Sequence, residues 1–126
     1  MTIQARPTTY KGIKMRSRLE ATWAQAFDRE GWADWEYEPR AYADETGQYL
    51  PDFWFANGNV PWFIEVKGYL EMTDLEDVLR RMEIVQTSEP TALLSLYVGS
   101  PNDEGFIGFD KLGPAEWMVH IVRHNS

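Results

Sequence analysis

Two aromatic and β-branched runs separated by an Asn-Gly dipeptide constrain the fold of this chain more than any other feature. Residues 50–55 (LPDFWF) and 60–68 (VPWFIEVKG) flank the dipeptide at positions 57–58. Asn-Gly favours the left-handed backbone of a tight turn, and extended runs on both sides of it are among the strongest short-range signals of a β-hairpin. We therefore expect two neighbouring antiparallel strands, with Asp52 on the first and Glu65 on the second.

Two helices are expected on either side of this hairpin. Residues 17–29 carry apolar side chains at helical spacing, with Ser17 as the cap and Gly31 beyond the end. After the hairpin, residues 73–76 (TDLE) match a capping box, in which a hydroxyl and a carboxylate satisfy free backbone N–H groups. The apolar spacing that follows predicts one helix continuing to about Ser88.

The other extended segments complete an α/β pattern. Residues 92–98 form a continuous apolar run, as in a strand buried on both faces, and edge strands are expected at 106–109 and 117–122. Residues 35–38 form a short extended stretch, with Glu36 and Glu38 on its polar side, and the polar segment 43–49 is expected to be a turn. We predict a single-domain α/β sandwich with a central mixed β-sheet over residues 1–126.

Composition excludes several kinds of site. The 126-residue chain has no cysteine, which rules out a disulfide framework, a thiolate zinc site and a cysteine nucleophile. Its two histidines, His120 and His124, lie near the C-terminus and are expected to be structural. No stretch approaches the roughly 20 apolar residues of a membrane span, so no membrane partner and a cytoplasmic location are expected.

Charge is distributed unevenly along the chain. The net charge is −8, yet residues 1–18 contain five basic residues and no acid. The phosphate backbone of a nucleic acid could bind this basic N-terminal segment (residues 1–16), while the acidic remainder of the chain faces away. An ordinary solvated basic stretch explains the charge equally well.

The segment 63–67 carries the candidate chemistry. Side chains alternate across a strand, so Glu65 and Lys67 share one face while Ile64 and Val66 point to the other. Asp52 arrives on the partner strand, and two converging carboxylates repel each other unless a cation such as Mg²⁺ joins them. The backbone carbonyl of Val66 can add an oxygen ligand, and a lysine beside the ion can orient water or neutralise charge on phosphate. This pattern indicates phosphodiester hydrolysis.

The same residues resemble the signature of a known superfamily. Pro51-Asp52, followed after twelve residues by Glu65-Val66-Lys67, is similar to the PD-(D/E)xK motif of the restriction-endonuclease-like nucleases. The strings YKG, RSRLE, WEYEP, YLPDF and EVKG, in that order over the first 70 residues or so, also resemble small uncharacterised phage and bacterial members. The resemblance implies an αβββαβ core, Mg²⁺ as cofactor with Mn²⁺ able to substitute, and DNA as substrate.

The resemblance also extends the candidate site. It implies that Glu20, on the first helix, faces the metal directly or through water, although pairing with Arg16 one turn earlier would make it an ordinary surface carboxylate. A basic or amide side chain of the second helix often faces such sites, and Arg80, Arg81 and Gln86 stay open as candidates, with ordinary helix charges as the alternative. Candidate DNA contacts are Lys11, Lys14, Arg16, Arg18, Tyr69 and Arg81. Tyr10 and Tyr69 could stack on bases or be buried in the fold.

Three functions remain open from the sequence. The leading one is a Mg²⁺-dependent nuclease, expected to be an endonuclease, that cleaves DNA with Asp52, Glu65, Lys67 and Glu20 as its catalytic residues. The second is a non-catalytic interaction module or DNA mimic that keeps the fold, which the acidic bulk would suit. The third is a four-way junction resolvase, which would have to be a homodimer.

Overall fold

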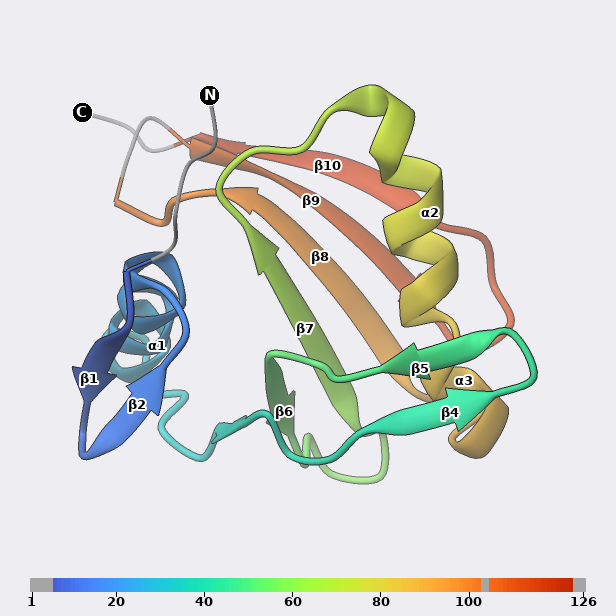
Figure 1. Ribbon diagram of the computed structural model, residues 1–126, viewed down its shortest axis with the longest axis horizontal. Helices are drawn as coiled ribbons and strands as arrows, with labels where there is room; N and C mark the ends of the chain where they lie inside the picture. Colours follow the sequence, from blue (N-terminus) through green and yellow to red (C-terminus); the bar gives the residue numbers. More distant parts are fainter. Residues whose placement is uncertain (1–5, 103–104, 124–126) are drawn as a thin grey trace.

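A computed structural model describes residues 6–102 and 105–123. It has a six-stranded central sheet, most of which can be followed in Figure 1. The strand order is β10-β9-β8-β7-β6-β3. Its strands are β3 (Glu36–Tyr37), β6 (Phe53–Phe55), β7 (Trp62–Lys67), β8 (Leu93–Gly99), β9 (Gly105–Leu112) and β10 (Met118–Arg123). β7 and β8 are parallel and every other neighbouring pair is antiparallel, so the predicted α/β fold with a central mixed sheet is confirmed.

Helices cover both faces of the sheet. α1 (Arg18–Arg29) packs on one face, and α2 (Met72–Met82) with the short α3 (Val85–Ser88) packs on the other (Figure 1). Alternate strand residues divide between the two layers, as the pleat requires: Ile64 belongs to the α1 layer and Phe63 to the α2 layer. Within residues 6–102 and 105–123, no helix is both long and apolar enough to cross a membrane.

The hairpin predicted around Asn-Gly is present. Residues 56–61 join β6 to β7, and in this loop Asn57 and Gly58 both adopt positive φ angles, +46° and +64°, the left-handed backbone that an Asn-Gly dipeptide favours. In the register of β6 and β7, Phe53 lies opposite Ile64. The next position therefore sets Asp52, which directly precedes β6, beside Glu65.

Two small hairpins were not predicted. β1 (Thr8–Tyr10) and β2 (Ile13–Met15) form the first within the basic N-terminal segment and pack against α1. β4 (Tyr42–Asp44) and β5 (Gly47–Tyr49) form the second, so the expectation of a simple turn at residues 43–49 is wrong. The side chains between Tyr42 and Tyr49 are polar apart from Ala43, and all of them stay outside the core, which leaves only the two tyrosines to anchor the pair on the α2 layer.

The predicted capping box is also wrong. α2 begins at Met72, with Glu71 as its N-cap and no capping side chain, so Thr73 already lies inside the helix. The first turn of α2 is exposed to solvent. Water can therefore satisfy its free N–H groups, and a side-chain cap is not required.

The second helix is shorter than expected and is followed by a separate turn of helix. α2 ends at Met82, and α3 begins at Val85. Met82, Ile84 and Val85 are all almost fully buried, at 0, 4 and 0% exposure. A continuous α-helix would turn Ile84 about 200° away from Met82, so the break allows all three side chains to reach the core.

A truncation on β8 tests the two-layered packing. Leu96 is completely buried in the middle of the sheet, whereas Leu112 at the end of β9 is 55% exposed. We expect Leu96→Ala to lower the free energy of unfolding by about 2–5 kcal/mol, and Leu112→Ala to change it by no more than about 0.5 kcal/mol. Urea denaturation followed by circular dichroism measures both, and equal losses would contradict this packing.

Candidate active site

β7 presents its polar residues on the α2 side of the sheet, as the alternation predicts. Ile64 and Val66 are 0 and 5% exposed and pack in the α1 layer. Glu65 and Lys67 therefore face the opposite side, with the Lys67 ammonium 3.5 Å from the Glu65 carboxylate. Lys67 is partly exposed while Glu65 is buried, so the pair opens to solvent at the lysine.

The Asp52 side chain is hydrogen-bonded to the backbone of β7. This side chain is buried, and its Oδ2 accepts a hydrogen bond of 2.9 Å from the backbone N–H of Val66. A strand residue directs its N–H and C=O to the same side, so the Val66 carbonyl points toward the edge where Asp52 lies. The structure thus brings together Asp52, Glu65, Lys67 and the Val66 carbonyl.

Tyr49 holds Glu65 from above the sheet. Its phenol donates a 2.6 Å hydrogen bond to Glu65 Oε1, and this hydroxyl comes from β5 in the unpredicted hairpin. Burial and the nearby Glu65 charge raise the pKa of the Tyr49 phenol well above its usual range, so the hydroxyl stays protonated and can donate. Sequence reasoning missed Tyr49, because nothing local distinguishes it from the other five tyrosines.

Arg16 links the carboxylates at the mouth of the site. Its guanidinium lies 3.3 Å from Asp52, 2.8 Å from Glu38 and 3.9 Å from Glu20. It was predicted as a DNA contact, and its side chain is still 61% exposed, but it also supplies positive charge to the carboxylates. The role of Glu38 as its closest ion-pair partner was missed, since Glu38 was assigned to the polar side of a strand.

Glu20 is not a surface carboxylate. It is only 6% exposed and lies in the first turn of α1, where Ser17 caps the helix by accepting from the Glu20 N–H as predicted. The Ser17 hydroxyl donates to Glu20 Oε2 at 2.6 Å, and the Tyr37 phenol donates to Oε1 at 2.9 Å. Glu20 does pair with Arg16 one turn earlier, as the alternative expected. Its carboxylate is buried, however, so the pair belongs to the site and is not a solvent-exposed ion pair.

The burial of two neighbouring carboxyl groups, those of Asp52 and Glu65, dominates the electrostatics of the site. Desolvation raises the pKa of Asp52 well above the ordinary carboxyl value, and repulsion by Glu65 raises it further. Desolvation likewise raises the pKa of Glu65, although the Tyr49 hydrogen bond and the Lys67 charge oppose the shift. The two carboxyls therefore retain protons that exposed carboxyls would lose.

A pocket of about 230 Å³ opens over this cluster. It is lined by Arg16, Gln48, Tyr49, Leu50, Glu65, Lys67, Val78 and Arg81. Arg81 is therefore the candidate of the second helix that reaches the pocket. Arg80 and Arg81 both pair with Asp77, Arg81 at 3.4 Å, but Arg80 does not line the pocket. Gln86 is held by the Ala92 and Gly113 carbonyls and by Lys111.

The donors fit a hard divalent cation held largely by water. Among residues 6–102 and 105–123, no three Asp, Glu or His side chains gather closely enough to form a complete metal cage. Magnesium commonly binds through one or two carboxylates and keeps several waters. Asp52, Glu65 and the Val66 carbonyl meet that requirement. Glu20 is hydrogen-bonded to Ser17 and Tyr37, and its carboxylate approaches the same Arg16 Nη2 nitrogen as that of Asp52.

The remaining predicted contacts are dispersed. Lys14 and Arg18 are exposed, as is Tyr69 at 77%, whereas Lys11 forms a 2.9 Å ion pair with Asp28. Tyr10 belongs to the fold, because it stacks on Trp35 and donates to Asp28. His120 pairs with Asp110 at 2.7 Å, and His124 lies outside the described residues.

Comparisons with known proteins return nothing: no protein-family model, no curated protein and no solved structure matches this chain.

The raised carboxyl pKa values predict an inverse dependence of stability on pH. In protein stripped of divalent cations with EDTA, the folded state binds protons on Asp52 and Glu65 at pH values where the unfolded chain has released them. The free energy of unfolding should therefore fall as the pH rises above about 4, the ordinary carboxyl pKa. Urea titrations at successive pH values measure this slope.

Two variants isolate the buried charge. Asp52→Asn keeps an oxygen for the Val66 N–H but removes the titration, so its slope should be shallower by up to about 1.4 kcal/mol per pH unit, the linkage of one proton. Glu45→Gln removes one exposed charge at the tip of the β4–β5 hairpin and should keep the wild-type slope. An unchanged slope in Asp52→Asn would contradict the assignment.

Proposed function

We propose that this chain is a divalent-metal-dependent nuclease that hydrolyses phosphodiester bonds in DNA, built on a restriction-endonuclease-like αβββαβ core. The observation that carries the proposal is the burial of Asp52 and Glu65 on one face of the sheet beside Lys67. Burying carboxylates costs several kcal/mol per charge before compensation. A fold that retains two of them side by side is best explained by a cation that they bind.

The order of elements supports the same proposal. α1, the β6–β7 hairpin, α2 and β8 follow one another as the PD-(D/E)xK resemblance implies, and β3 is the third central-sheet strand between the helices, while β4 and β5 form a separate hairpin. DNA as substrate, action as an endonuclease, and a phage or bacterial setting belong to this proposal and rest on that resemblance. A cytoplasmic location belongs to it too, and rests on the sequence pattern described above.

Each residue of the site has a chemical role in the proposed reaction. Asp52, Glu65 and the Val66 carbonyl would hold Mg²⁺ or Mn²⁺, which supplies Lewis acidity and lowers the pKa of bound water. The Lys67 ammonium neutralises negative charge that develops on the phosphoryl oxygens as water attacks phosphorus and the leaving oxygen departs. Tyr49 fixes the orientation of the Glu65 carboxylate through Oε1, so Oε2, which lies 3.5 Å from the Lys67 ammonium, is the oxygen that would also meet the cation.

Arg16 has two roles in this proposal. Its guanidinium pairs with the Asp52 carboxylate and so compensates that negative charge without a divalent cation. Because its side chain is 61% exposed, its remaining N–H groups can also meet a phosphate of the substrate. Arg81 on the opposite wall of the pocket offers a second guanidinium.

Substitution of the central residues tests catalysis. Asp52→Asn, Glu65→Gln and Lys67→Met should each lower the rate of Mg²⁺-dependent cleavage by at least about 100-fold, because each removes a ligand of the cation or the charge that faces the phosphate. The assay follows duplex, single-stranded and branched DNA, with RNA alongside, by gel electrophoresis. Glu76→Gln on the exposed face of α2 is the matched control and should cut at the wild-type rate.

Binding of Mn²⁺ separates the nuclease from a non-catalytic module. Calorimetry should show a bound ion in the wild type and weakened binding in Asp52→Asn and Glu65→Gln. If the wild type showed neither cleavage nor metal binding, this would favour the non-catalytic alternative, in which Arg16, Lys67 and the hydrogen bonds from Tyr49 and Val66 compensate the carboxylates without a cation.

An exposed edge strand favours a homodimer of the proposed nuclease. Among the described strands, β10 pairs with β9 alone, and its Met118, Val119 and Ile121 are 73, 63 and 63% exposed. Free edges are usually protected by lysine, proline or a bulge. β10 contains no acid in a chain of net charge −8, so two copies would meet there with the least repulsion. The junction-resolvase alternative requires such a pair.

Light scattering tests the dimer. The wild-type chain should elute with twice the mass of one chain, and Ile121→Lys should elute as a monomer, since a lysine on the edge disfavours strand pairing. Ala33→Lys, at an exposed loop position after α1, should leave the mass unchanged. A monomeric wild type would exclude the dimer, and with it the resolvase.

A further inference from the structure

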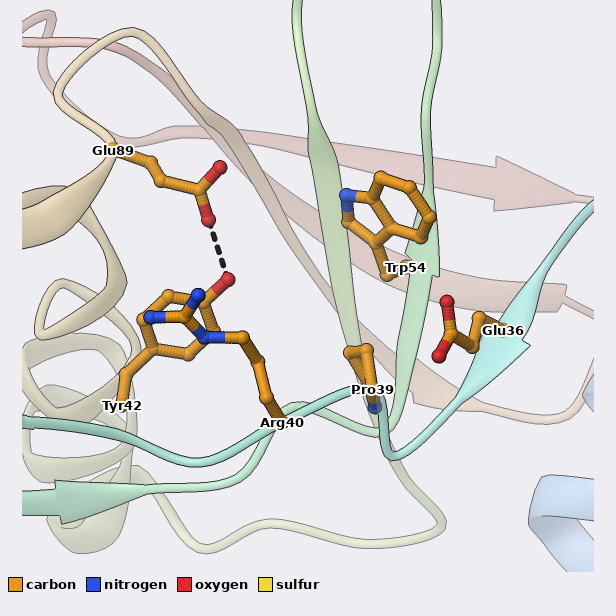
Figure 2. Close-up of a pocket in the computed structure, with 6 residues that line it drawn as sticks. All are labelled: Glu36, Pro39, Arg40, Tyr42, Trp54 and Glu89. Atoms are coloured by element: carbon orange, nitrogen blue, oxygen red, sulfur yellow. Dashed lines mark hydrogen bonds between the residues drawn. The ribbon is translucent and has the colours of Figure 1, made fainter.

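A second pocket lies on the same face of the sheet as the candidate active site. Its volume is about 280 Å³, and it is lined by Glu36, Pro39, Arg40, Tyr42, Trp54 and Glu89 (Figure 2). Trp54 follows Asp52 by two residues and so projects from the same face, about 7 Å further along the chain. Tyr42 is the cross-strand partner of Tyr49, whose hydroxyl holds Glu65. Both pockets thus adjoin the β4–β5 hairpin, with Tyr49 lining the first and Tyr42 the second.

One wall of this pocket is a fixed stack. The Arg40 guanidinium lies 4.5 Å from the centroid of the Tyr42 ring, and the Tyr42 hydroxyl donates to the Glu89 carboxylate (Figure 2). Below, the Tyr42 ring packs edge-on against Phe63 at 5.4 Å. The face of the Arg40 guanidinium is occupied by this stack, but no carboxylate of the described residues pairs with its N–H edge.

The other wall combines an aromatic ring with a carboxylate. Trp54 and Glu36 are paired in the register of β6 and β3, which sets them side by side across from Arg40 and Tyr42 (Figure 2). Trp54 is half-buried, and Glu36 is exposed and forms no ion pair with the described residues. The pocket therefore offers a flat ring face, a free acceptor beside it and a guanidinium edge opposite.

This combination selects the chemistry of the ligand. A cationic ligand would suit Glu36 but would be repelled by Arg40, and an apolar ligand would leave both charges without partners. A nucleotide satisfies all three elements: its base stacks on Trp54, its N–H edge donates to Glu36, and its phosphate meets Arg40. The volume is near the lower limit of small-ligand pockets, about 300 Å³, and suits one base.

Glu36 further restricts the identity of the base. A carboxylate is acceptor-only and is best matched by two adjacent N–H donors. Guanine presents such a pair on its Watson–Crick edge, at N1 and the 2-amino group, whereas thymine offers a single N–H between two carbonyls. Because that edge is occupied in a duplex, the base must be unpaired to enter.

From this geometry we infer that the second pocket binds an unpaired guanine nucleotide of the substrate strand and biases cleavage toward sites near guanine. The identification of the ligand as part of a nucleic acid strand rests on the proposed nuclease function. Trp54 and Glu36 act in substrate recognition and not in the cleavage chemistry.

Metal-free binding tests the pocket without requiring catalysis. In EDTA, guanosine 5′-monophosphate should shift the indole N–H resonance of Trp54 in a ¹H–¹⁵N spectrum, identified by its absence in Trp54→Phe. Inosine 5′-monophosphate, which lacks the 2-amino group, and thymidine 5′-monophosphate should bind at least about tenfold more weakly. Glu36→Gln should weaken guanosine 5′-monophosphate about tenfold, and Glu45→Gln should not change its affinity.

The outcomes of this titration are distinct. Arg40→Gln should weaken guanosine 5′-monophosphate while leaving the affinity for guanosine unchanged, as expected if Arg40 binds the phosphate. Absence of any Trp54 shift, equal affinities for the nucleotides, or preferential binding of tetramethylammonium would overturn the inference.

Cleavage of matched oligonucleotides then connects the pocket to the active site. With Mg²⁺, the wild type should cut a single strand containing one guanine with a higher kcat/KM than the same strand containing inosine, and Glu36→Gln should lose this ratio. Nucleotide binding without any cleavage would refute the nuclease and keep the pocket. Cleavage that ignores guanine would refute the role of the pocket and keep the nuclease.

Discussion

Two carboxylates buried at the start of β6 and on β7 set the requirement that the surrounding structure satisfies. Such charges destabilise a fold unless they are paired and hydrogen-bonded. Here the Val66 N–H bonds to Asp52, Tyr49 bonds to Glu65, and Arg16 approaches Asp52 from the segment before α1. The compensation comes from three separate parts of the chain, so the site forms only when the N-terminal segment and the β4–β5 hairpin have both docked on the sheet.

The local rules of β-structure were sufficient to predict the centre of the site. The Asn-Gly dipeptide specified a hairpin, and a strand has a side-chain period of two, so Glu65 and Lys67 had to share a face opposite Ile64. Antiparallel pairing then left Asp52 beside Glu65. The order of helices and strands also followed from apolar spacing, which is why the α/β fold with a mixed sheet could be predicted.

The partners of these carboxylates could not be predicted, because they come from distant segments. Arg16 reaches Asp52 across 36 positions, and Tyr49 reaches Glu65 across 16. Neither contact leaves a periodic trace in the sequence. The same limit explains the missed β4–β5 hairpin, whose polar residues resemble a loop, and the break before α3, which is decided by the burial of Ile84.

Charge explains how an acidic chain can act on a polyanion in the proposed reaction. Of the five basic residues at the N-terminus, Lys11 is paired with Asp28 and Arg16 with site carboxylates, so the positive field of that segment is smaller than its composition implies. Long-range attraction of DNA is correspondingly weak, and the net charge of −8 opposes it. A divalent cation would then have two roles: it would neutralise Asp52 and Glu65, and it would thereby allow a phosphate to approach them. In the proposed complex, stacking of a base on Trp54 would add affinity that salt does not screen, which suits a protein with few free cations.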